Sequence, residues 1–205
     1  MNATDHRHKG FTLVETLVAI AILLIAVAGP LLAASRASVL ASVSRDEMTA
    51  SYLAQEGVEY VRAMRDDEYL GLYPSGDPDD AWNNFLNGTN AASVKLCRST
   101  TCSLDPSKNT MGVSTGGTTT LQPCGGATGV ACAQLYPNGS GLYSRDMNSG
   151  YAGTLFTRTV QVLDIPGTSD SPAPYPEKEV VSSVSWNSHG TTYNVTVRDH
   201  LTPWQ

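Results

Sequence analysis

The feature that most constrains this chain is an apolar run near its start, over residues 11–34. The run contains one charged side chain, Glu15, and residues 17–34 contain none. In a helix, these 24 residues would extend ~36 Å at ~1.5 Å per residue, which exceeds a hydrocarbon core of ~30 Å. A carboxylate inside such a segment is costly, so Glu15 needs either a partner or a place at the membrane edge.

The residues that open the run form a specific junction. Gly10-Phe11-Thr12-Leu13-Val14-Glu15, preceded by the basic residue Lys9, resembles the processing and methylation site of type IV prepilins and type II secretion pseudopilins. In that family, a membrane aspartyl peptidase cuts after the glycine and methylates the new N-terminus. The resemblance implies a leader of residues 1–10, a cut between Gly10 and Phe11, and a methylated Phe11. It covers residues 1–34 strongly and the rest of the chain weakly.

The resemblance also gives Glu15 a role in assembly. After cleavage, the ammonium of Phe11 is a cation at an apolar surface, and Glu15 of an adjacent subunit can supply the opposite charge. Two alternatives stay open. Glu15 could sit at the cytoplasmic edge of a simple anchor, or the segment could be a secretory signal peptide cut near residues 33–35. Against the second alternative, the apolar run is longer than the usual ~7–15 residues of a signal peptide.

Charge and topology follow from the leader. The formal net charge is −6, and removal of a leader with two basic and one acidic side chain leaves −7. A positive leader before an apolar span predicts a cytoplasmic N-terminus and an external head. The expected location is the inner membrane, and after assembly a surface pilus or a periplasmic pseudopilus. An acidic head disfavours nucleic acid as a partner.

Residues 35–66 are more polar but keep a helical pattern. Apolar residues recur at spacings of three, four or seven, at Val39, Val43, Ala50, Leu53, Ala54, Gly57, Val61 and Met64. This pattern predicts an amphipathic second half of one long helix that packs on a head domain, and a separate surface helix is the alternative. Residues 53–66 also resemble the end of this helix in minor-pilin-like proteins. Gly29 and Pro30 predict a kink or local melting within the apolar half.

The last third of the chain predicts β-structure. Residues 155–165, 180–186 and 193–201 alternate apolar and polar side chains, and residues 187–190 suit a hairpin turn. A Pro- and Ser-rich linker, residues 169–176, separates the first two runs. The expected fold class is α+β, with the long N-terminal helix packed on the antiparallel sheet of a head formed by residues 67–205. This order of elements matches the pilin architecture.

The middle of the head offers turns and cysteines. We expect a short helix at residues 81–86 with Asp79 or Asp80 as its cap, and loops over residues 97–141. Cys97, Cys102, Cys124 and Cys132 allow three pairings. The local pairs 97–102 and 124–132 are favoured because short loops cost little to close, and the second spacing is too wide for a typical zinc site.

No catalytic motif, cofactor fingerprint or metal site emerges. Asp77, Asp79 and Asp80 could attract calcium, but they lack an EF-hand spacing, so a solvated acidic turn is favoured.

The interpretation is therefore a non-enzymatic pilin or minor pilin of a type IV pilus-like filament. Its expected partners are other pilin subunits, a prepilin peptidase, the inner-membrane assembly platform and, before assembly, the lipid bilayer. The alternatives are a type II secretion pseudopilin and an anchored adhesin or DNA-binding tip subunit.

Overall fold

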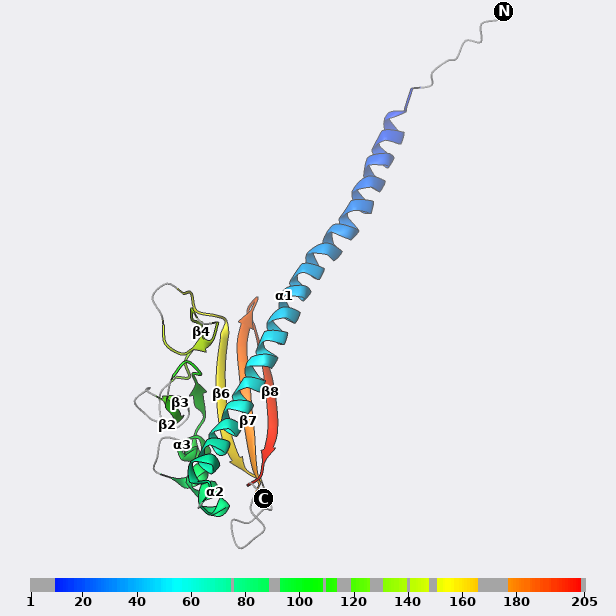
Figure 1. Ribbon diagram of the computed structural model, residues 1–205. Coiled ribbons are helices and arrows are strands. Elements are labelled where there is room, and N and C mark those ends of the chain that lie inside the picture. Colours follow the sequence, from blue (N-terminus) through cyan, green and yellow to red (C-terminus); the bar gives the residue numbers. More distant parts are fainter. Residues whose placement is uncertain are drawn as a thin grey trace, which may run out of the picture. The chain divides into compact units, whose positions relative to one another are not determined.

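A computed structural model describes residues 10–74, 76–88, 93–108, 110–113, 119–125, 131–139, 141–147, 151–165 and 177–203. The chain forms two compact units, the first ending at Arg45 and the second beginning at Asp46. Helix α1, Leu13–Leu72, supplies the first unit and continues into the second (Figure 1).

The start of α1 is fixed by local hydrogen bonds. The backbone N–H of Glu15 donates to Thr12 Oγ1 at 3.2 Å, so Thr12 is the N-cap and Glu15 lies in the first turn. Further along, α1 passes through Gly29 and Pro30 without interruption. The kink or local melting that these two residues suggest stays a prediction.

The second half of α1 buries one face in the second unit. Its buried residues are Ala50, Leu53, Ala54, Gly57, Val58, Val61 and Met64. The predicted amphipathic face is thus present from Ala50 onward, although Val39 is 43% exposed and the buried Val58 was missed. The helix also extends past residue 66, because the polar residues that follow are compatible with helix. It ends at Leu72, just before Tyr73-Pro74, where proline disfavours helical backbone in the preceding residue.

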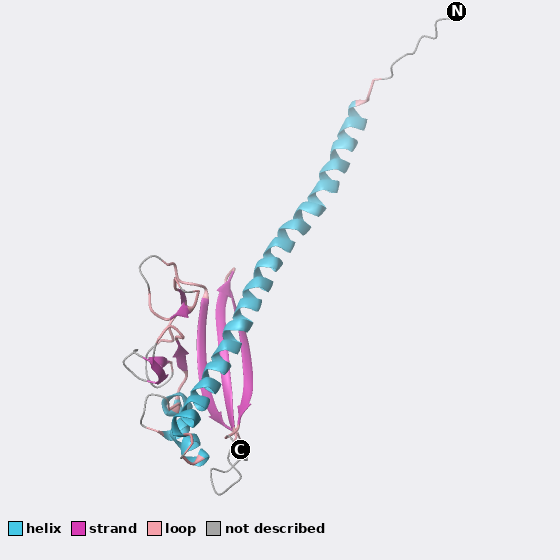
Figure 2. Cartoon of the chain, in the orientation of Figure 1, coloured by secondary structure: helices cyan, strands magenta, loops and turns pink. Residues whose placement is uncertain are grey.

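The sheet of the second unit has six strands in the order β2-β3-β1-β6-β7-β8. These strands are β1 Cys102–Leu104, β2 Thr110–Val113, β3 Thr119–Pro123, β6 Phe156–Asp164, β7 Lys178–Ser188 and β8 Thr191–Leu201. All neighbours pair antiparallel except β2 and β3. A small second sheet pairs β4, Tyr136–Pro137, with β5, Tyr143–Ser144. A long helix packed on an antiparallel sheet confirms the predicted α+β, pilin-like fold (Figure 2).

The β6–β8 meander follows its sequence pattern closely. Side chains on β6 and most of β7 alternate between buried and partly exposed, as the alternation predicts. Ser188 pairs with Thr191, so the hairpin turn consists of His189 and Gly190. Both have positive φ, 52° and 81°, which is the geometry of a tight type I′ turn.

Helix and sheet approach closely at Gly57. A Cβ added there would overlap Ser182 Oγ, lie 3.0 Å from Ser182 Cβ and lie 3.2 Å from Val160 Cγ2. Small residues on both elements therefore permit the contact. Around it, apolar side chains of α1 meet those of β6 and β7, including Val61, Met64, Val162 and Val180.

Two expectations for the middle of the head were wrong. Residues 97–141 include ordered β1 and β3, and the short helix α3, Lys95–Ser99, ends among them. These strands are too short to show a repeating apolar pattern in the sequence. They are ordered because β1 pairs with both β3 and β6. Helix α2, Pro78–Asn87, is capped by Asp77 instead of Asp79 or Asp80, because Pro78 suits the first helical turn and the Asp79 N–H donates to Asp77 Oδ1 at 3.0 Å. The predicted linker at residues 169–176 lies outside the described residues.

Candidate functional site

The helix of the first unit presents a large exposed apolar surface. Large apolar side chains between Phe11 and Leu32 are 52% to 79% exposed, and they occur on every side of the helix. A helix that is apolar all round is stable only when lipid or other protein covers it. By length and composition, α1 can cross a membrane, although a signal sequence passes the same test.

The junction before α1 is exposed in the structure. Gly10 and Phe11 are exposed and precede the first helical residue. A Cβ at Gly10 would meet no atom within 4 Å, so the fold of this chain does not require glycine there.

Glu15 has a local role that sequence analysis missed. Thr12-Leu13-Val14-Glu15 has the capping-box spacing, in which a Glu or Gln three residues after Thr favours the helix start. A carboxylate in the first turn also interacts favourably with the helix dipole. In the same chain, the next basic residue after Glu15 is Arg36, 21 positions further along. Between Glu15 and Arg36, α1 therefore offers no basic side chain that could pair with Glu15.

The head is attached to α1 by a buried ionic contact. Arg158 lies on the core face of β6 with its side chain fully buried and forms an ion pair with Glu56 of α1. It also donates hydrogen bonds to the carbonyl oxygens of Leu53 and Leu104, each at 3.2 Å. Burial lowers the pKa of Arg158, while the nearby carboxylate of Glu56 opposes that shift. Sequence analysis missed this residue, although the alternation of β6 places an arginine on the apolar face.

A second buried cluster holds the segment after β5 on the sheet. The carboxylate of Asp105 accepts hydrogen bonds from Ser107, from Ser144 Oγ at 2.8 Å and from the Arg145 N–H at 3.1 Å. Burial by itself raises the pKa of Asp105, but these hydrogen bonds lower it below the ordinary value. The Arg145 guanidinium in turn donates to the carbonyl oxygen of Thr120 at 3.2 Å.

The four cysteines form two disulfides. Cys97–Cys102 joins α3 to β1, and Cys124–Cys132 joins the end of β3 to the segment before β4. These are the local pairs that the spacing favoured. Both bridges lie in the part of the head with the shortest strands, where a covalent link supports order that a small core does not supply.

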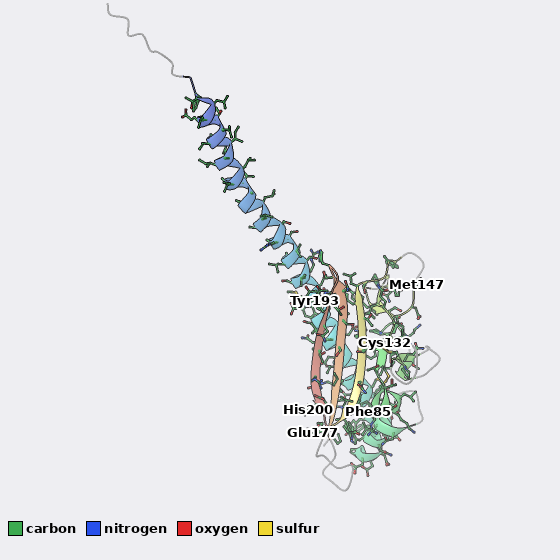
Figure 3. The ribbon with its side chains drawn as sticks, turned by 180° about the vertical axis from the view of Figure 1, so that it is seen from behind. Phe85, Cys132, Met147, Glu177, Tyr193 and His200 are labelled. Atoms are coloured by element: carbon green, nitrogen blue, oxygen red, sulfur yellow. A yellow bond between two sulfur atoms is a disulfide. The ribbon has the colours of Figure 1, made fainter. Side chains whose placement is uncertain are left out.

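The remaining polar candidates lie apart from these clusters. Asp77 caps α2, and Asp79 and Asp80 occupy its exposed first turn. Within the described residues, no group of three or more His, Cys, Asp or Glu side chains is arranged to hold a metal ion. His200 Nδ1 lies 3.2 Å from Glu177 Oε2 at one end of the sheet, away from Tyr193 near the other end (Figure 3).

Comparison with known proteins identifies the N-terminal segment. Residues 5–29 match the family described as the prokaryotic N-terminal methylation motif. No curated protein and no solved structure shows significant similarity to the chain. The matched segment contains the Gly10–Phe11 junction, Glu15 and most of the apolar run, and it distinguishes the run from a signal peptide of the ordinary secretory type.

Proposed function

We propose that this chain, a prepilin-like protein with an N-terminal methylation motif and a pilin-like fold, is a pilin or minor pilin of a type IV pilus-like filament. A prepilin peptidase cuts it after Gly10 and methylates Phe11. The mature chain waits in the inner membrane with its head outside and then enters the filament through its N-terminal helix.

The observation that carries the proposal is the exposed apolar helix. Its large apolar residues from Phe11 to Leu32 are more than half exposed, whereas α1 buries its apolar face from Ala50 to Met64 against its own head. A surface this apolar is stable in lipid before assembly and among other apolar helices after it. One segment thus provides both the anchor and the filament contact.

Glu15 gives assembly a defined electrostatic partner. The proposed counter-charge is the methylated Phe11 ammonium of a neighbouring subunit, since α1 itself has no basic residue before Arg36. Pairing the two ions in an apolar filament core costs far less than burying either one alone. Gly29 and Pro30 are the proposed site at which the helix opens when subunits pack, because proline removes one backbone donor there.

The partners follow from this route. They are the peptidase, the inner-membrane assembly platform and other pilin subunits, in a filament of one or several kinds of chain. A type II secretion pseudopilus would use the same processing and the same helix, so it is the second candidate. The acidic sequence disfavours DNA as a ligand of the head.

The test compares processed protein in sheared filaments with that in membranes. Cells that express the chain with its assembly machinery should release it in the filament fraction, and intact mass should give a start at methylated Phe11. Deletion of its gene should reduce surface filaments if it is a pilin and secretion of exported proteins if it is a pseudopilin. A mature start near Arg36, or exclusive recovery in membranes, would contradict the proposal.

A further inference from the structure

A groove in the second unit lies between α1 and the start of β5. It is lined by Thr49, Tyr52, Leu53 and Glu56 of α1 and by residues 141–143, and its volume is about 360 Å³. The side chain of Tyr52 is 65% exposed. Most of the described lining is apolar or aromatic, and Glu56 is the one charged residue among the described residues that line it. Such a groove fits a side chain that has an apolar stem and a cationic end.

The fold holds Glu56 in a fixed place. The buried Arg158 binds Glu56 Oε2, while the Glu56 side chain remains 32% exposed. A carboxylate has acceptor sites on both oxygens, so Oε1 can accept from a second donor. Arg158 already orders the Glu56 side chain. That side chain therefore loses little further conformational entropy when a second cation binds.

The charge pattern of α1 indicates which cation this is. Residues 46–61 contain four carboxylates and no basic side chain. In the first unit, Arg36 is the one charged residue between Glu15 and Arg45, and it is exposed. The two parts of α1 therefore carry opposite charges.

The residues around Arg36 are mostly apolar, as is the lining of the groove. Ser35, Arg36, Val39 and Leu40 line a shallow, mostly apolar depression of about 310 Å³. Val39 and Leu40 are 43% and 66% exposed. The segment thus presents a cation beside two uncovered aliphatic side chains, which complements a carboxylate beside Tyr52 and Leu142.

We propose that the groove receives the Arg36 segment of a second copy of this chain. In this contact the guanidinium binds Glu56, and Val39 and Leu40 pack on Tyr52 and Leu142. The inference rests on the proposed function, since it requires copies arranged side by side in a filament. The copies are parallel and staggered by 20 residues, so that Arg36 of one copy lies at the level of Glu56 of the other.

Cysteine cross-linking tests the contact directly. The four native cysteines are already paired, so new cysteines have no native thiol to react with. The double variant Leu40→Cys/Leu142→Cys should give a ladder of disulfide-linked copies in sheared filaments under mild oxidation, because Leu40 packs on Leu142 in the proposed contact. Each single variant should lack the ladder, and so should Leu40→Cys/Asp79→Cys, because Asp79 lies on the exposed first turn of α2 and does not line the groove.

Charge reversal tests the same contact without new cysteines. Arg36→Glu should lower incorporation into filaments by roughly 5- to 30-fold, the factor that one to two kcal/mol gives. Tyr52→Arg should also lower it by repelling Arg36, and the exposure of Tyr52 makes this variant compatible with the folded head. Combining the two changes should restore incorporation, because the opposite charges then face each other again. Ser38→Glu adds the same charge close to Arg36 and should incorporate like the parent.

Three results would overturn the inference while the parent chain still enters filaments. These are no ladder from the double cysteine variant, normal incorporation of Arg36→Glu, or a cross-link to a different filament protein only. A ladder of equal strength in membranes of a strain that cannot assemble filaments would also overturn it, by removing the link to assembly. Absence of the parent chain from filaments is a different result, and it would contradict the proposed function itself.

Discussion

One helix contains two contrasting surfaces. From Phe11 to Leu32, the large apolar side chains of the first unit are more than half exposed. From Ala50 to Met64, one face of α1 is buried against the sheet, and the other faces are polar or partly exposed. The second half is completed by its own head, whereas the first half needs lipid or other chains to cover it.

This difference shows what a helix pattern can reveal about partners. An amphipathic stripe indicates that the chain itself buries the helix, as Leu53 and Val61 do against the head. An apolar surface on all sides indicates cover from outside the chain. Substitutions in the two halves should therefore affect different properties: processing and assembly in the first half, and stability of the head in the second.

The largest effect is expected at the junction. Gly10→Leu should leave the precursor uncut, because the peptidase requires a small residue at the scissile bond. Insertion depends on the apolar run and should be unchanged. Intact mass should show the parent shortened by ten residues and the variant at full length. A variant cut as efficiently as the parent would contradict the assigned junction.

The same substitution in the two halves separates their roles. Leu53 is 4% exposed and Leu23 is 63% exposed. Leu53→Ala should destabilise the head by ~2–5 kcal/mol, the usual cost of a cavity in a core. Leu23→Ala should leave the head's stability unchanged. Thermal unfolding of the full chain in detergent would compare the unfolding midpoints of the two variants. Equal midpoints would contradict the claim that only the second half of α1 stabilises the head.

The close contact of helix and sheet gives a second matched pair. Gly57→Ala places a methyl group against Ser182 and should destabilise the head by ~1–3 kcal/mol, as overpacking does. Gly71 lies in the same helix with nothing within 4 Å of an added Cβ. Gly71 is one residue from the end of α1, so Gly71→Ala should change the stability of the head by less than ~0.5 kcal/mol. Urea unfolding would show a loss of stability for Gly57→Ala alone, and equal stability of the two variants would refute the close approach at Gly57.

The smallest effect should appear as a pH dependence of the head. The pKa of Asp105 is lower in the folded head than its ordinary value of ~3.9. Asp105 therefore contributes stability that is complete above that ordinary value and is lost as pH falls through the lower, folded-state pKa. Asp105→Asn has no carboxyl group at this position to protonate, so its stability should fall less steeply with pH than that of the parent. Urea midpoints measured from neutral pH downward would test it, and parallel curves for parent and variant would contradict it.

Regular patterns made much of this molecule predictable. The apolar run, the alternation in β6 to β8 and the His189-Gly190 turn are local features, and each was legible because its spacing repeats or its residues prefer one geometry. The strands β1 and β3 were missed because their order comes from pairing with each other and with β6. The burial of Arg158 was also missed, because its ion-pair partner Glu56 lies more than a hundred positions away in the sequence.

The candidate site divides in the same way. The motif that contains Gly10 and Glu15 stands out in the sequence because it is a short, local pattern, and the family match covers it. The cut after Gly10 and the assembly role of Glu15 stay predictions. The groove beside Glu56 was not readable, since it needs residues of α1 and residues 141–143 together. The N-cap role of Thr12 could have been predicted from its spacing to Glu15. It was missed because Glu15 was considered only as a charge for assembly.

The central claim is that other copies of the chain cover the exposed half of α1, with Glu15 paired to a neighbouring Phe11 ammonium. Glu15→Gln tests it directly, because Gln still suits the capping box and only the charge is lost. Breaking a buried pair typically costs ~3–5 kcal/mol, a factor of roughly 10² to 10³ in an equilibrium. The measurement is quantitative blotting of sheared filaments against membranes. The account predicts normal cleavage, accumulation in membranes and a sharp loss from filaments, whereas incorporation equal to that of the parent would contradict it.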